Sequence, residues 1–164
     1  SAFFQMKSDK YTAFSHASID DIFGKRIINH AKKILQANTT SSYLIWNDEG
    51  SFRWEKLPVE LQLSPIKEMI IEDFNNDNYP DILVGGNDYT YDPGTGLYDA
   101  NKGFVLINKA GQMTENDFAF RVLSPSESGI LLQGMVESLL YFENEEPFIV
   151  VGINRGKTLV YKQK

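Results

Sequence analysis

The chain has 164 residues, of which 42% are hydrophobic and 23% charged, so it suits one folded domain with a core rather than a disordered chain. Its 22 acidic and 16 basic residues give a net charge of -6, which argues against a nucleic-acid binder that works by neutralising phosphates. The absence of cysteine excludes disulfides and thiolate metal sites, and no apolar run approaches the roughly 20 residues that span a bilayer.

The N-terminal part is predicted to contain a helical patch at residues 18–37. Ser18 and Asp21 resemble a capping box, and apolar residues recur at helical spacing from Ile19 to Leu35. We expect Gly24 to divide this patch into two short helices.

From residue 42 onward, short apolar runs alternate with turn residues, which indicates a mainly β fold. Hairpin-type turns are expected at residues 108–111 and 154–157, so the strands should form antiparallel meanders. Strands are predicted at residues 43–46, 51–54, 66–72, 82–84, 104–107, 118–122, 131–136, 138–142, 148–153 and 158–161. The whole chain is interpreted as one module, with an N-terminal helical insertion at 18–37 and β structure over 42–164.

The segment between the strands at 66–72 and 82–84 carries oxygen-bearing side chains at alternate positions. Asp73, Asn75, Asp77 and Asp81 occupy positions 1, 3, 5 and 9 of a loop, and the carbonyl of Tyr79 is available at position 7. Three carboxylates in one tight loop repel one another without a counter-charge. Hard oxygen donors select a hard cation, so the segment predicts a Ca²⁺ site.

The flanks of the loop separate two calcium architectures. An EF-hand needs a bidentate Glu at position 12, but Val84 stands there, and the flanking residues favour strands rather than helices. Position 6 is Asn78, a residue type that tolerates the left-handed backbone conformation. The alternative is an acidic, Asn-rich turn that binds no metal.

These residues carry a family resemblance. The run Asp73–Leu83 resembles the aspartate-rich loop of VCBS/FG-GAP repeats, which form the blades of integrin-like β-propellers. Further segments resemble the C-terminal region of large bacterial VCBS-repeat proteins of the ASPIC/UnbV-like type, namely Leu57-Pro58, Gln62–Ile66, Gly86–Tyr89, Gly96–Ala100 and Ser128-Gly129. The resemblance implies calcium ligation by Asp73, Asn75, Asp77, Asp81 and the Tyr79 carbonyl, and a partial propeller fold.

The chain length limits how much of a propeller it can supply. At roughly 40–50 residues for each four-stranded blade, 164 residues correspond to about three blades, and a closed ring needs at least four. The module is therefore expected to be a fragment of a larger propeller or a partner to one.

A second loop, residues 86–103, is rich in tyrosine and aspartate. Its candidate ligand-binding residues are Asp88, Tyr89, Tyr91, Asp92, Tyr98 and Asp99, because tyrosines offer rigid contact area for a glycan or a peptide. The alternative is a self-packed loop whose tyrosines cover a sheet edge.

Three functions are compatible with these features. The first is a non-enzymatic, calcium-stabilised binding or adhesion module at the cell surface or outside the cell, with a protein or glycan ligand. The second is a subunit that completes a propeller in an envelope complex. The third is a carbohydrate-active hydrolase or lyase that uses Asp88, Asp92 or Asp99. Direct membrane insertion and nucleic-acid binding are not expected.

Overall fold

The computed structural model describes residues 11–90, 94, 96–110, 112 and 117–162, and the chain divides into two compact units, residues 1–40 and 41–164. The described part of the first unit contains the short helices α1 (Tyr11–Ser15), α2 (Ile19–Phe23) and α3 (Lys25–Asn29). None of the helices described is both long and apolar enough to cross a membrane.

The predicted helix start and the predicted interruption are confirmed. The Ser18 hydroxyl accepts a hydrogen bond from the Asp21 backbone at 3.2 Å, while the Asp21 carboxylate accepts one from the Ser18 backbone at 2.9 Å. Gly24 has a φ of 79° and separates α2 from α3, which suits a residue without a Cβ.

The predicted C-terminal limit of the helical patch is wrong. Helix α3 ends at Asn29, and residues 32–40 have no regular secondary structure. Ile34 and Leu35 are 72% and 79% exposed. An apolar stripe stabilises a short helix mainly by packing against another surface, and these side chains have no such cover.

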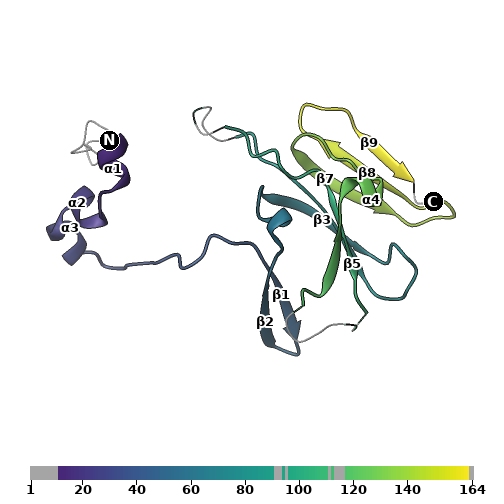
Figure 1. Cartoon of the computed structure of the whole chain (residues 1–164), viewed down its shortest axis with the longest axis horizontal. Helices are drawn as coiled ribbons and strands as arrows, with labels where there is room; N and C mark the ends of the chain where they lie inside the picture. The colour runs from purple at the N-terminus through teal and green to yellow at the C-terminus, as the bar shows by residue number, and fades with distance from the viewer. Residues whose placement is uncertain (1–10, 91–93, 95, 111, 113–116, 163–164) are drawn as a thin grey trace. The chain divides into compact units, whose positions relative to one another are not determined.

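The second unit holds all nine strands of the described chain, arranged in three antiparallel sheets (Figure 1). The sheets follow the chain as a hairpin β1-β2, a four-stranded meander β3-β4-β5-β6 and a three-stranded meander β7-β8-β9. The strands are β1 (Tyr43–Asp48), β2 (Ser51–Lys56), β3 (Ile66–Glu72), β4 (Asp81–Gly86), β5 (Phe104–Asn108), β6 (Phe120–Leu123), β7 (Val136–Phe142), β8 (Phe148–Ile153) and β9 (Leu159–Lys162). A one-turn 3-10 helix, η1 (Val59–Leu61), precedes β3, and the one-turn helix α4 (Pro125–Ser128) follows β6.

The mainly β fold class is therefore confirmed, whereas three four-stranded sheets are not found. One sheet has four strands, and its neighbours have two and three. The sheets do not close into a barrel. The expected turns at residues 108–111 and 154–157 begin at the ends of β5 and β8, and Gly111 lies outside the described residues.

One predicted strand is absent. Residues 131–135 carry apolar side chains, and Leu132 and Met135 are buried, but the segment is not part of any sheet. Gly134 has a φ of 106°, and its carbonyl accepts a hydrogen bond from a side chain of another segment rather than from a strand. The strand therefore begins only at Val136.

The middle sheet is covered on both faces, which gives the unit two cores. On one face Leu83 and Val105 pack against Leu139 and Val151 of the last sheet. On the other face Leu106 and Phe120 pack with Trp46 of the hairpin, whose ring stacks on Phe120 at 5.9 Å. Because alternate side chains of a strand point to opposite faces, a sheet buried on both faces needs nearly continuous apolar strands. Strand β4, Asp81–Gly86, is buried along its whole length.

Candidate functional site

The acidic loop, residues 73–80, connects β3 to β4, and Asp81 is the first residue of β4. Glu72 and Asp81 are the last paired residues of this antiparallel ladder. Asn76 and Asn78 have φ values of 59° and 67°, so the chain turns through two left-handed residues. The expectation that Asn78 takes the left-handed conformation at loop position 6 is confirmed.

Backbone N–H groups hold the side chains of the loop in place. The two oxygens of Asp73 accept hydrogen bonds from the backbone of Asp77 at 3.1 Å and of Asn78 at 2.7 Å. The Asn75 carbonyl oxygen accepts a second bond from the Asp77 backbone at 3.0 Å, and Asp77 accepts one from the Tyr79 backbone at 2.9 Å. The side chains at positions 1, 3 and 5 are thus turned back toward the loop's own backbone.

Asp81, at the start of β4, holds the two ends of the loop together. It is fully buried, and its carboxylate oxygens accept hydrogen bonds from the backbone of Phe74 at 3.1 Å and of Asn108 at 2.8 Å. Burial raises the pKa of Asp81 above its usual value. The negative charges of Asp77 and Asp73 also raise this pKa, whereas the two backbone hydrogen bonds lower it. The carboxylate thus ties both ends of the loop and β5 together.

The donor set suits a hard cation, although its carboxylates are not gathered around one point. Within the described residues, no Lys, Arg or His forms an ion pair with Asp73, Asp77 or Asp81. Across the same part of the chain, no three His, Cys, Asp or Glu side chains lie together as a metal-binding group. Three carboxylates and one amide are hard oxygen donors of the kind that Ca²⁺ takes, and their hydrogen bonds to backbone N–H groups would have to be exchanged for metal contacts.

The tyrosine and aspartate loop is pinned at its base. Asp88 and Tyr98 form an isolated antiparallel bridge through backbone hydrogen bonds of 2.9 and 3.2 Å. Tyr91 and Asp92, two of the predicted ligand-binding residues, lie outside the described residues. Tyr89 and Tyr98 are about two-fifths exposed, at 39% and 42%, and Asp99 is exposed.

The Asp88 carboxylate is committed to partners inside the protein. One oxygen accepts hydrogen bonds from the Thr90 hydroxyl at 2.6 Å and backbone at 2.8 Å, and the other pairs with the Lys67 ammonium at 3.0 Å. The bonds from Thr90, followed by that from Lys67, lower the pKa of Asp88 to about 2. Asp88 is therefore a structural anion, which leaves Tyr89, Tyr98 and Asp99 as the exposed described members of the predicted ligand surface.

The same loop depends on a buried residue that the sequence analysis missed. Asn87 is fully buried with a φ of 80°, and its amide donates to the carbonyls of Asn101 and Gly134 at 2.7 and 2.8 Å. Its carbonyl accepts from the Ser64 hydroxyl and the Asn101 backbone, each at 2.9 Å. Only the left-handed preference of Asn signals such a position in sequence, because its partners come from distant segments.

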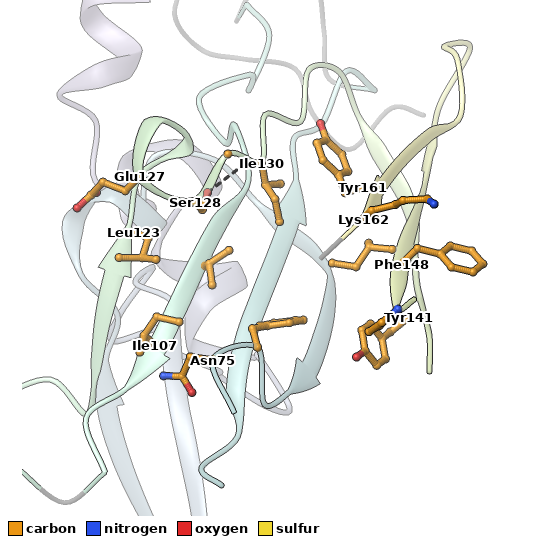
Figure 2. A pocket seen from close by; sticks show the side chains of 15 residues that line it. Asn75, Ile107, Leu123, Glu127, Ser128, Ile130, Tyr141, Phe148, Tyr161 and Lys162 are labelled. Atoms are coloured by element: carbon orange, nitrogen blue, oxygen red, sulfur yellow. Dashed lines mark hydrogen bonds between the residues drawn. The ribbon is translucent and has the colours of Figure 1, made fainter. Parts of the chain in front are cut away.

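An apolar cavity of about 610 Å³ lies between the middle and last sheets (Figure 2). The acidic loop forms part of its wall, because Phe74 and Asn75 line it, and the Phe74 ring meets the Tyr141 ring edge-on with centroids 6.2 Å apart. The wall also includes Ile107, Leu123, Ile130, Ile149 and Tyr161. No sequence pattern indicates this cavity, because its strand residues alternate as ordinary strand residues do and the wall forms only when two sheets pack.

Comparisons with protein-family models, with curated proteins and with solved structures find no significant match to this chain.

Proposed function

We propose that this chain is a calcium-stabilised binding or adhesion module of an exported or cell-surface protein, with a non-catalytic role. The observation that carries the proposal is the acidic loop, whose three carboxylates include one that is fully buried and lack an ion-pair partner among the described residues. A divalent cation would supply the missing counter-charge. Asp73, Asn75, Asp77 and Asp81, with the Tyr79 carbonyl, would hold it.

The arrangement of strands supports a propeller-like architecture for the module. Consecutive antiparallel meanders follow one another along the chain, and the first strands of two successive sheets, β3 and β7, contact each other. A propeller repeats such sheets around an axis, with each first strand innermost. On this proposal, β3–β6 is one complete blade and the other two sheets are incomplete blades, as the resemblance to VCBS/FG-GAP repeats implies.

Calcium in this proposal orders a loop rather than folding the chain. Extracellular modules bind Ca²⁺ with dissociation constants of about 10⁻⁴ to 10⁻³ M, and ten-fold excess over that value stabilises a fold by about 1.4 kcal/mol. Such a site fills outside the cell. Because Phe74 and Asn75 belong both to the loop and to the cavity wall, ordering the loop would also fix that side of the cavity.

The ligand surface in this proposal is the exposed part of the second loop. Tyr89 and Tyr98 are partly exposed residues of the same loop as the exposed Asp99, and tyrosine and aspartate suit stacking against a sugar or packing against a peptide. Asp88 contributes by holding this loop in place through Lys67 rather than by touching a ligand.

The test is the change in melting temperature between calcium and chelator. Wild type is compared with Asp73→Asn, which keeps the shape of the side chain but removes a charge from the loop. As a matched control, Asp48→Asn removes one charge from an exposed position on the β1-β2 hairpin. We expect calcium to raise the melting temperature of wild type and of Asp48→Asn but not that of Asp73→Asn.

Equal responses of all three proteins would show that the loop is a plain acidic turn. A response that Asp73→Asn retains and Asp99→Asn loses would move the cation to the second loop.

A second candidate function is favoured by a specific observation, namely the apolar faces that the two outer sheets leave exposed. Ile45, Phe52 and Trp54 are 48%, 63% and 65% exposed on the hairpin, and Leu140 and Val160 are 51% and 60% exposed on the last sheet. Soluble monomers rarely expose large contiguous apolar patches. These faces suit a subunit that completes a larger β assembly.

A further inference from the structure

The outer sheets of the stack each have one covered and one uncovered face. Hairpin residues Leu44 and Trp46 face the middle sheet, and Leu139 and Ile149 of the last sheet face it from the other side. Neighbouring residues along a strand point to opposite faces, so the residues between these positions face away from the stack. The stack therefore ends in two outer faces that no other sheet of the described residues covers.

The outer face of the hairpin is aromatic. Tyr43 lies opposite Lys56, Ile45 opposite Trp54, and Asn47 opposite Phe52 in the β1-β2 ladder, so all six side chains share one face. The rings of Tyr43 and Trp54 meet edge-on with centroids 6.3 Å apart. We call Tyr43, Ile45, Phe52, Trp54 and Lys56 the hairpin face.

The outer face of the last sheet is also apolar. Leu140, Val150 and Val160 form one row across β7, β8 and β9. In the next row, Phe142 stacks on Phe148 with ring centroids 4.9 Å apart and planes 11° from parallel. We call these five residues the last-sheet face.

The two faces differ in charge in a way that lets them complement each other. Lys162 also lies on the last-sheet face, opposite Phe148, and its ammonium pairs with Glu146. Lys56 carries a positive charge on the hairpin face, whereas the turn after Phe142 carries exposed Glu143 and Glu145. In the described part of the chain, none of these three side chains forms an ion pair, while the neighbouring Glu146 pairs with Lys162 at 2.6 Å. Opposite charges on the two faces favour one face meeting the other, and the like charges of Glu143 and Glu145 disfavour a last-sheet face meeting its own copy.

We propose that copies of this chain associate head to tail, with the hairpin face of one copy packed on the last-sheet face of the next. The contact continues the stacking already present in each copy, where sheets with two apolar faces pack on one another. Because the contact joins two different faces, it generates rings or open arrays rather than a two-fold dimer. This association is independent of calcium and of the proposed ligand surface.

The size of the hairpin face limits the strength of the contact. Six residues of strand span about 20 Å, and the hairpin is two strands wide, so the buried area falls at the low end for specific interfaces. We therefore expect association that increases with concentration in the micromolar range rather than a permanent complex.

The test is sedimentation velocity of the full chain over a range of concentrations. We expect the weight-average mass of wild type to rise above the monomer value of 18.7 kDa, whereas Trp54→Glu and Val160→Glu should each remain at that value. Val59→Glu is the matched control, because Val59 is 67% exposed but lies outside both faces, and it should associate like wild type. Phe52→Glu and Leu140→Glu serve in place of either variant that fails to fold, as judged by circular dichroism.

Mixing the two defective variants tests the head-to-tail geometry. Trp54→Glu retains an intact last-sheet face and Val160→Glu an intact hairpin face, so an equimolar mixture should form a dimer and nothing larger. The proposal is overturned if wild type stays monomeric throughout, if either single variant associates like wild type, or if the folded variants fail to pair when mixed.

Discussion

The two acidic loops that flank β4, residues 73–80 before it and 86–103 after it, lie at opposite ends of the strand and differ in how their negative charge is balanced. In the second loop, Lys67 and Thr90 take up both carboxylate oxygens of Asp88. In the first, Asp73, Asp77 and Asp81 have only backbone and amide partners within the described residues. A count of acidic residues therefore does not identify a cation site. A better indicator is acidic charge that the protein leaves without a cationic partner.

The largest effect is expected at the base of the second loop. Asn87→Ala removes all four side-chain hydrogen bonds of a buried residue and places alanine at a φ of 80°, which should lower the free energy of unfolding by more than about 3 kcal/mol. Chemical denaturation measures this change. Asn76→Ala is the control, because Asn76 shares the left-handed conformation but is exposed, and it should cost only about 1 kcal/mol. Equal losses would mean that backbone strain alone matters at Asn87.

A smaller effect is expected at the base of the first loop. In Asp81→Asn an NH2 group replaces one of the two carboxylate oxygens. This NH2 group then faces a backbone N–H donor, that of Phe74 or that of Asn108, so the calcium-free protein should be destabilised by about 2 kcal/mol. Asp48→Asn, at an exposed position, should change stability by less than about 0.5 kcal/mol in the same denaturation experiment. If Asp81→Asn were as mild as this control, the carboxylate would not hold the loop to β5.

Ionisation of Asp88 and of Asp81 should change the stability of the protein in opposite directions. The pKa of Asp88 is lowered to about 2, so its contribution to stability is present above its ordinary pKa of 3.8 and is lost as pH falls toward 2. The pKa of Asp81 is raised by folding. Ionisation of this carboxyl group therefore lowers the free energy of unfolding as pH rises above its ordinary pKa of 3.8. Denaturation of calcium-free protein between pH 7 and pH 2 should show a smaller acid loss in Asp88→Asn than in wild type. A larger loss in that variant would contradict the assignment of Lys67 and Thr90 as its stabilising partners.

The smallest of these effects concerns the exposed tyrosine. Tyr98→Ala should change the free energy of unfolding by less than about 1 kcal/mol, because the side chain is 42% exposed and the residue's backbone makes the bridge to Asp88. Thermal melts measure it against Tyr141→Ala, whose ring packs beside Phe74 and whose loss should cost more. Similar costs would show that the second loop is built on its tyrosines rather than on Asn87.

The strands were predictable because alternation and turn residues are local signals. The positions of the nine described strands follow from these signals to within about two residues at each end. The turn at the acidic loop was equally readable, since Asn at a left-handed position carries its own preference, as Asn78 shows. Local pattern also placed the capping box at Ser18 correctly.

What could not be predicted depends on partners far away in the sequence. Lys67 neutralises Asp88 from 21 positions upstream, and Asn87 reaches Gly134 across 47 positions. The strand predicted at 131–136 is missing over residues 131–135 for the same reason, because the Gly134 carbonyl accepts a hydrogen bond from the distant Asn87 side chain. The helix predicted beyond Asn29 does not form, because its apolar side chains have no surface to pack against. The number of strands in each sheet also depends on packing rather than on composition.

Calcium binding by the first loop can be tested by titrating the protein with calcium and following the backbone amide signals of both loops in a nitrogen–proton correlation spectrum. The amides of Asp77, Asn78 and Tyr79 donate to the side chains of the proposed ligands, so metal binding should shift them first. We predict saturating shifts confined to residues 73–81, with the amides of Asp88, Thr90 and Tyr98 unchanged. Shifts at those three residues, or no shift in either loop at millimolar calcium, would contradict the claim that the first loop binds calcium.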